Sequence, residues 1–223
     1  MSNSSTFLKR HDVIVSSQAV TGSILQDPDA LVRIGLDAIA GGANALRLAG
    51  AKTVELARPK TRLPIIGLIK TQRDEFEPRI TVISQEIENL KSAGADIVAI
   101  DSTNRYRPEP IEKLYKTATN LKLEIFADIA TVEEGKQAID LGATYVATTL
   151  AGYTADRQIT EGPDFELLEN IVGIGAKAVI EGRVSTSDHL RKAINLGAYA
   201  IVIGRAVTSP QIILKSLLKE LNK

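Results

Sequence analysis

Eight short apolar runs, each followed by a longer stretch with helical spacing, constrain this chain more than any other feature. The runs are rich in Val, Ile and Ala and do not alternate polar with apolar residues, which indicates strands buried on both faces. We expect these strands at Asp12–Ser17, Ala45–Leu48, Ile65–Lys70, Ile97–Asp101, Glu124–Asp128, Tyr145–Thr149, Ala178–Glu181 and Ala200–Gly204. We expect helices at Pro28–Ala40, Gly50–Arg58, Gln85–Ala93, Pro110–Asn120, Val132–Leu141, Phe165–Val172, Ser187–Leu196 and Pro210–Leu221. The alternation predicts an α/β fold, a single (β/α)8 TIM barrel over residues 1–223, with residues 1–10 as a loose or partly helical lead-in.

A repeated joint between helix and strand supports this interpretation. Gly94, Gly142 and Gly197 each follow a predicted helix, and a strand begins within three residues of each. Glycine suits the left-handed position that ends a helix because it has no Cβ atom. An open flavodoxin-like or Rossmann sheet would show the same joints and stays an alternative. The missing G-x-G-x-x-G fingerprint after the first strand counts against a dinucleotide-binding sheet.

The charge and residue content exclude several classes of protein. Lys+Arg and Asp+Glu both number 27, so the overall charge favours neither a nucleic-acid nor a membrane partner. The chain has no cysteine, which rules out disulfides and thiolate metal sites. The first residues lack the apolar stretch of a signal peptide, and a cytoplasmic location is expected.

Polar residues close almost every predicted strand. In (β/α)8 barrels the working residues lie at the carboxyl ends of the strands and in the loops that follow. Charged groups cannot sit in a dry barrel without partners, but at one rim they can pair with each other and with a ligand. The strand-closing residues are Gln18, Arg47, Lys70, Asp101, Asp128, Thr149, Glu181 and Arg205.

Lys70 is the strongest single candidate for a catalytic residue. It follows an apolar run, and a partly desolvated lysine has a lowered pKa, so it can act as a base or form a Schiff base. The structural alternative is an ion pair with Asp101, Asp128 or Glu181. Glu181 could hold a substrate hydroxyl, transfer a proton or orient the Lys70 amine, or could simply pair with Arg183.

Two Gly-Arg pairs predict a phosphate site. Gly182-Arg183 and Gly204-Arg205 follow the seventh and eighth predicted strands, where such barrels often bind phosphate beside a short extra helix. Glycine allows close backbone approach, and arginine adds bidentate charge. Metal binding is not expected, because His11 precedes the first strand and His189 lies within a helix.

The same positions carry a series of motifs found together in one family. They are Val15-Ser-Ser-Gln18-Ala, Gly42-Ala-Asn-Ala-Leu-Arg47, Pro64-Ile-Ile-Gly-Leu-Ile-Lys70, Asp96-Ile-Val-Ala-Ile-Asp101-Ser-Thr-Asn-Arg105, Ala127-Asp128-Ile-Ala-Thr131-Val-Glu-Glu134, Thr148-Thr-Leu-Ala-Gly-Tyr153-Thr, Pro163-Asp-Phe-Glu-Leu-Leu168, Glu181-Gly-Arg183 and Gly204-Arg-Ala-Val-Thr-Ser-Pro210. The chain resembles the bacterial N-acetylmannosamine-6-phosphate 2-epimerase (N-acylglucosamine-6-phosphate 2-epimerase) family over nearly its whole length.

The resemblance implies an isomerase that interconverts N-acetylmannosamine 6-phosphate and N-acetylglucosamine 6-phosphate in amino-sugar or sialic acid catabolism. It implies Lys70 as the proton-transfer residue with Glu181 as its partner. Proton transfer of this kind needs no cofactor. By the same resemblance Gln18, Arg47 and Asp128 hold the sugar, with Asp101, Thr149 and Tyr153 expected to contact it. Gly182, Arg183, Gly204 and Arg205 would then hold the phosphate of a phosphorylated N-acyl amino sugar.

Three positions depart from the family pattern. Ser17 stands where the family often has cysteine, so that cysteine cannot be essential here. Gly204-Arg205 replaces a smaller pair. The segment Thr71–Val82 is unusually charged, and substrate detail could differ there.

A lysine base at residue 70 would remove the C2 proton of the open-chain sugar to form an enediol-like anion, which Arg47 or protonated Lys70 would stabilise. The proton returns either from Lys70 or from a group linked to Glu181. Two rivals stay open: a Schiff-base aldolase that uses Lys70 as nucleophile, and a non-catalytic phosphosugar sensor.

The last predicted helix, Pro210–Leu221, carries six Ile and Leu residues. We expect most of this stripe to pack on the barrel and part of it to form the face of a homodimer, which the resemblance favours.

Overall fold

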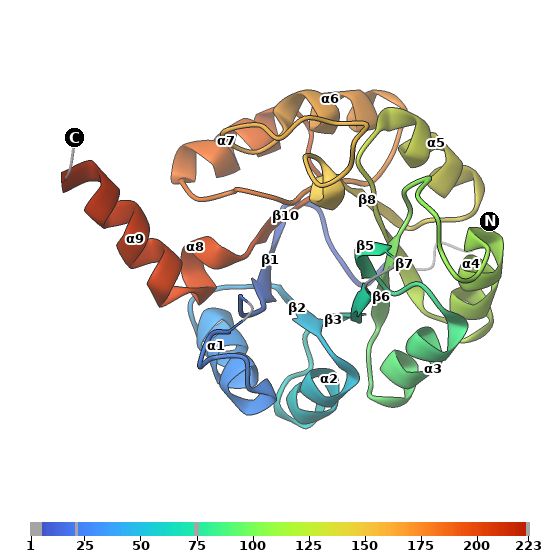
Figure 1. The fold of residues 1–223 in the computed structure, drawn as a ribbon, viewed down its shortest axis with the longest axis horizontal. Coiled ribbons are helices and arrows are strands. Elements are labelled where there is room, and N and C mark those ends of the chain that lie inside the picture. Colours follow the sequence, from blue (N-terminus) through green and yellow to red (C-terminus); the bar gives the residue numbers. More distant parts are fainter. Residues whose placement is uncertain (1–5, 21, 74–75, 222–223) are drawn as a thin grey trace.

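The computed structural model describes residues 6–20, 22–73 and 76–221 and places eight parallel strands in a closed barrel (Figure 1). The order around the barrel is β1-β10-β9-β8-β7-β6-β3-β2, and β1 pairs with both β10 and β2. The closed ring confirms the predicted (β/α)8 barrel and excludes the open sheet. The barrel strands are β1 (Asp12–Ser17), β2 (Ala45–Ala49), β3 (Ile65–Leu68), β6 (Ile97–Asp101), β7 (Glu124–Asp128), β8 (Tyr145–Ala147), β9 (Ala178–Ile180) and β10 (Ala200–Ile203).

Helices cover the outside of the barrel close to where the sequence predicts them (Figure 1). Several begin at a capping side chain: Asp27 accepts from the backbone of Ala30, and Thr131 forms a capping box with Glu134. The helices are α1 (Pro28–Ala40), α2 (Ala51–Ala57), α3 (Ser84–Ser92), α4 (Ile111–Asn120), α5 (Val132–Asp140), α6 (Phe165–Gly173), α7 (Ser187–Asn195), α8 (Arg205–Thr208) and α9 (Pro210–Leu221), with short 3-10 turns η1 (Arg58–Lys60) and η2 (Thr148–Leu150). None of the helices in the described ranges is long and apolar enough to cross a bilayer.

Strand alternation divides the core into two parts. One residue of each adjacent pair packs outward against the helices, and the other points into the barrel. The inward residues form a separate apolar cluster that includes Ile66, Leu68, Phe126 and Tyr145. At the carboxyl end of the barrel, the inward positions of several strands are polar: Ser16, Arg47, Asp101 and Asp128 follow Ile14, Ala45, Ala99 and Phe126 by two residues.

The segment before β1 closes the amino end of the barrel. Leu8 is 1% exposed, donates its N–H to Tyr145 Oη at 3.0 Å and accepts from Tyr199 Oη at 2.8 Å. Residues 6–10 of the predicted lead-in form no helix and are anchored to the barrel through Leu8, because the interior of the barrel has an open lower end that this leucine fills. The remainder of that prediction, residues 1–5, lies outside the described residues.

A hairpin follows β3 and changes the setting of Lys70. β4 (Lys70–Arg73) pairs antiparallel with β5 (Phe76–Ile80), and Lys70 lies opposite Ile80. Lys70 is thus the first residue of this hairpin, whereas the sequence placed it last in the third barrel strand. The hairpin backbone occupies most of the atypical segment Thr71–Val82, but the charged side chains at 71–79 lie outside the described residues.

Helix α9 stands away from the barrel (Figure 1). Leu214, Leu217 and Leu218 are 56%, 62% and 45% exposed. The prediction that most of its apolar stripe packs on the barrel is wrong, because the short helix α8 directs the chain outward before α9 begins.

Candidate active site

An arginine inside the barrel holds two carboxylates at its carboxyl end. Arg47 on β2 donates from Nη2 to Asp128 Oδ2 at 2.6 Å and from Nη1 to Glu181 Oε1 at 2.8 Å. Arg47 is 2% exposed, Asp128 is fully buried, and Glu181 is 12% exposed. The guanidinium also lies 5.6 Å from the ring centroid of Phe126, the apolar layer below. The sequence predicted that charged groups pair at one rim, and the structure shows that Arg47 is the residue that joins Asp128 and Glu181.

Two threonines of η2 secure Glu181. Thr149 Oγ1 lies 2.5 Å from Asp128 Oδ1 and 3.2 Å from Glu181 Oε2. Thr148 Oγ1 donates to the backbone oxygen of Glu181 at 2.9 Å and accepts from its backbone N–H at 3.0 Å. The turn therefore fixes both the backbone and the carboxylate of Glu181.

Burial makes these carboxyl groups weak acids. Desolvation raises the pKa of Asp128 to about 7, against the lowering effect of Arg47. Desolvation likewise raises the pKa of Glu181, again opposed by Arg47. With a pKa of about 7, Asp128 can exchange a proton near neutral pH.

Lys70 lies within electrostatic range of this cluster. Desolvation, followed by the charge of Arg47, lowers the pKa of Lys70, and Arg205 adds to this while Glu181 opposes it. The Lys70 residue is nevertheless exposed to solvent, so its desolvation is only partial. Among the described residues its amine has no hydrogen bond or ion pair, which leaves it available to a substrate.

Asp101 is occupied by its own loop. It accepts from the backbone N–H and Oγ1 of Thr103 and forms an ion pair of 2.8 Å with Arg105. Arg107 lies 3.9 Å from the same carboxylate. The sequence predicted a sugar contact here, whereas the structure shows these oxygens bonded to protein. Arg107 was missed, and only the proximity of two arginines to Asp101 in the sequence could have suggested it.

Arg183 binds the loop after η2. It donates to the backbone oxygens of Gly162 and Ala151 at 2.8 and 3.2 Å and to Thr160 Oγ1 at 3.0 Å. It does not pair with Glu181, so that structural alternative is not realised. Tyr153 lies in the same loop with its side chain 48% exposed, and its backbone oxygen accepts from Arg105 at 3.3 Å.

The other predicted contacts surround the barrel mouth. Arg205 begins α8, the short helix expected after the last strand, and its guanidinium has no partner in the described part of the chain. Gly182 has φ of 109°, a left-handed conformation that side chains rarely adopt. Gln18 donates to Ser16 Oγ at 2.7 Å. Ser17 is turned away from the site, where it bonds the backbone oxygen of Leu31.

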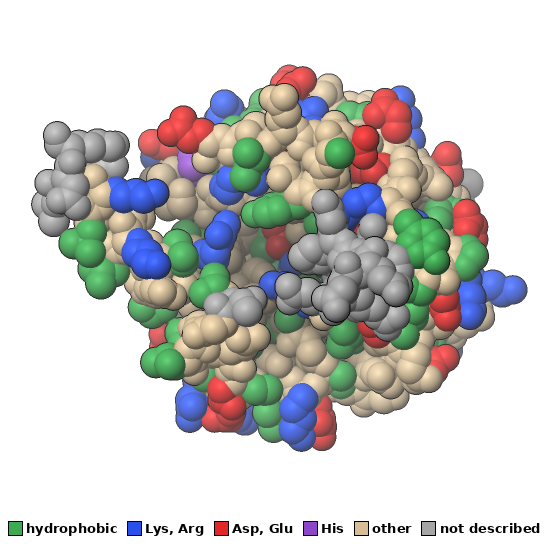
Figure 2. Space-filling view, viewed as in Figure 1, with side chains coloured by type: hydrophobic (Ala, Val, Ile, Leu, Met, Phe, Trp, Pro, Cys, Tyr) green, Lys and Arg blue, Asp and Glu red, His purple; other side chains and the backbone are tan. Residues whose placement is uncertain are grey.

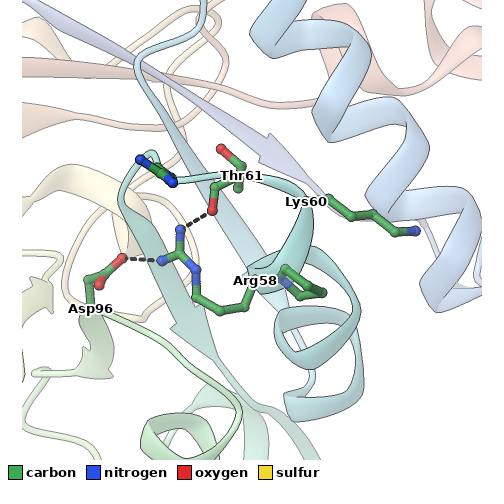
Figure 3. A pocket seen from close by; sticks show the side chains of 6 residues that line it. Arg58, Lys60, Thr61 and Asp96 are labelled. Carbon is green, nitrogen blue, oxygen red and sulfur yellow. Dashed lines mark hydrogen bonds and ion pairs between the residues drawn. The ribbon is translucent and has the colours of Figure 1, made fainter.

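Two hollows on the surface of the described structure differ in the side chains that line them. Figure 2 shows a hollow in the centre of the barrel face, with acidic and basic side chains inside it. A second hollow is lined by Arg58, Lys60, Thr61 and Asp96 (Figure 3). These residues precede β3 and β6 and so lie at the amino rim, and Arg58 is bonded to Asp96 at 2.8 Å and to the backbone oxygen of Thr61. The ionisable side chains that could act on a substrate therefore lie at the carboxyl rim.

Known proteins resemble this chain over most of its length. A family model described as "Putative N-acetylmannosamine-6-phosphate epimerase" matches residues 30–223. This chain belongs to the N-acetylmannosamine-6-phosphate epimerase family. Curated epimerase relatives of that description include one from Clostridioides difficile, 34% identical over 94% of this chain and 95% of the relative. Another, from Clostridium perfringens strain 13, is 38% identical over 92% of this chain and 94% of the relative.

Solved structures extend the epimerase comparison. The structure titled as the N-acetylmannosamine-6-phosphate 2-epimerase from Clostridium perfringens superposes with a TM-score of 0.92 at 36% identity, covering 96% of this chain and 94% of that one. A tryptophan synthase alpha-subunit from Pyrococcus furiosus reaches a TM-score of 0.66 at 18% identity, which shows a shared fold alone. In the described residues of this epimerase-family chain, no three His, Asp or Glu side chains are grouped to hold a metal ion.

Proposed function

We propose that this chain interconverts N-acetylmannosamine 6-phosphate and N-acetylglucosamine 6-phosphate by removing and returning the proton on C2. Family membership supports the substrate. The observation that carries the chemistry is that Lys70, an amine with lowered pKa, lies within electrostatic range of Arg47 and Glu181 in the Arg47–Asp128–Glu181 cluster. A carbon acid next to an aldehyde needs a base at C2 and a positive environment for the oxygen that gains charge.

Lys70 is the proposed base. Its lowered pKa increases the fraction of free amine near neutral pH, and the residue is exposed to solvent. The free amine takes the C2 proton of the open-chain sugar, and the bonding electrons move to C1 and its oxygen. The resulting ammonium then stands beside the enediolate that it helped to form and stabilises it.

Glu181 is the proposed partner on the other side of the substrate. It is slightly exposed at the mouth, and its raised pKa allows it to carry a proton. Asp128 and Arg47 lie beneath it, out of contact with solvent, and their role in this proposal is to hold the carboxyl group of Glu181 in place.

The proposed phosphate site lies at Gly182, Gly204 and Arg205. Arg205 is exposed, has no partner among described residues and lies close enough to affect the pKa of Lys70. Arg183 was expected to bind phosphate as well. Because its guanidinium already contacts three protein oxygens, we propose that it shapes the site by holding the loop of Tyr153.

Proton NMR of N-acetylmannosamine 6-phosphate with the protein in deuterated water tests the function. We expect the gluco epimer to appear with deuterium on C2. Lys70→Ala should lower the rate by ~10²-fold or more with an unchanged thermal midpoint, because the side chain makes no described hydrogen bond. Lys52→Ala, which removes an exposed lysine paired with Glu55, is the control and should keep full turnover. Full turnover in Lys70→Ala would remove this residue from its role.

We further propose that the enzyme works as a homodimer in the cytoplasm, in amino-sugar or sialic acid catabolism. Leu214, Leu217 and Leu218 recur at helical spacing on α9, which projects from the barrel (Figure 1). An exposed apolar stripe of this kind is typical of an interface, and a second copy is the occupant that we propose.

A further inference from the structure

Thr149 joins two carboxyl groups that come from different strands. Its Oγ1 lies 2.5 Å from Asp128 Oδ1 and 3.2 Å from Glu181 Oε2. The two bonds between Thr148 and the backbone of Glu181 hold this spacing. A continuous path of hydrogen-bonding oxygens therefore runs from a fully buried carboxyl group to one that reaches the mouth.

The number of hydrogens available along this path indicates how many of the two carboxyl groups are protonated. A threonine hydroxyl has one hydrogen to donate and can also accept. If both Asp128 and Glu181 were ionised, that single hydrogen could serve only one of them at a time. When one carboxyl group carries a proton, it can donate to Thr149, which then donates to the other, and both short contacts are satisfied.

The charges of Arg47, Asp128 and Glu181 likewise indicate that the two carboxyl groups share one proton. Arg47 supplies one positive charge to the two carboxyl groups, and these three side chains are almost completely buried. An uncompensated charge there would be costly, so one shared proton leaves the group of three neutral. Among the described residues, the other charged groups that act on the pair are Lys70, on Glu181, and Asp101, on Asp128.

We propose that Thr149 relays a proton between Asp128 and Glu181, so that Asp128 serves as the reservoir for the group that protonates C2. This inference rests on the proposed epimerase function and adds a two-base route with a named source for the second proton. Thr149 acts through Glu181 and is a positioning and relay residue, where the sequence suggested a sugar contact.

The relay is balanced in protons. Before C2 is protonated, the one shared proton lies on Asp128: Glu181 Oε2 takes the hydrogen of Thr149 Oγ1, and that oxygen takes the carboxyl hydrogen of Asp128, so that Glu181 can give a proton to C2. One proton has then moved from Asp128 to Glu181, and Thr149 is again a hydroxyl. Once product leaves, Lys70 releases its extra proton to water, and a proton from water enters at Glu181 and returns along the path to Asp128.

The test measures exchange of the C2 proton with solvent separately from inversion of configuration at C2. In deuterated water with N-acetylmannosamine 6-phosphate, NMR follows deuterium entering C2 of the remaining substrate and, separately, formation of the other epimer. Lys70 alone can exchange the proton on its own face, whereas inversion needs Glu181 reloaded. We expect Thr149→Val to lower inversion by ~10-fold or more relative to exchange, and Thr149→Ser, which keeps the hydroxyl, to restore the wild-type ratio.

Asp128→Asn provides a second measurement, and it substitutes for Thr149→Val if that variant does not fold. It removes the far end of the relay, so the same loss of inversion relative to exchange is expected. An unchanged ratio in the folded variants, with the two rates lowered equally or not at all, would overturn the relay alone. No exchange and no inversion in the wild-type protein would overturn the epimerase function and the relay together.

Discussion

Arg47 and Asp128 form an ion pair of 2.6 Å between strands that lie across the barrel, and neither side chain is more than 2% exposed. Arg47 has a second carboxylate partner in Glu181. Removing the arginine would leave two carboxyl groups buried without their counter-charge. The pair is therefore a structural requirement as well as a part of the candidate site.

Arg47→Met should lower the free energy of unfolding by about 3–5 kcal/mol, the usual effect of breaking one side of a buried pair. Urea unfolding followed by circular dichroism measures this. Arg33→Met is the matched control, because the Arg33–Asp29 pair is exposed, and such pairs contribute about 0–1 kcal/mol. Equal stability of the two variants would contradict the buried pair.

Asp128 should titrate near neutral pH. Its folded pKa of about 7 lies above its ordinary value because of burial, so the folded protein keeps this proton over a range where the unfolded chain has lost it. The contribution of Asp128 to stability should therefore fall as the pH rises from about 4 to about 7. Carbon-13 NMR of labelled aspartate should show one carboxyl group with this titration, missing in Asp128→Asn. A titration near pH 4 for every aspartate would show that Asp128 is not desolvated as described.

Arg183→Ala should loosen the loop from Ala151 to Gly162, because three hydrogen bonds to that loop are lost. Limited proteolysis should cut this loop faster than in the wild-type protein. Arg191→Ala, which removes only exposed contacts within α7, is the control and should leave cleavage unchanged. Unchanged cleavage together with a raised KM for the phosphosugar would instead identify Arg183 as a direct phosphate ligand.

Leu217→Glu should disrupt the proposed dimer, because it places a charge in the middle of the exposed stripe of α9. Size-exclusion chromatography with light scattering should give a dimer for the wild-type protein and a monomer for the variant. Lys215→Glu changes the charge of the same helix at another exposed position and should stay dimeric. A monomeric wild-type protein would remove the dimer from the proposal.

The sequence by itself determined the order and bounds of the barrel elements. The strand bounds agree to within two residues, because apolar runs and helix caps are local signals that depend on neighbours along the chain. The positions of Arg47, Asp128 and Glu181 at strand ends were also readable, since parallel strands bring their carboxyl ends to one rim.

Only the tertiary structure decided what each polar group contacts. Asp128 and Glu181 are 81 and 134 residues from Arg47, and no local pattern states that one guanidinium bridges both. The same holds for Arg183 on a distant loop, Leu8 inside the barrel and the outward course of α9. Hydrogen bonds and burial depend on distances between segments remote in sequence, which exist only once the barrel has closed.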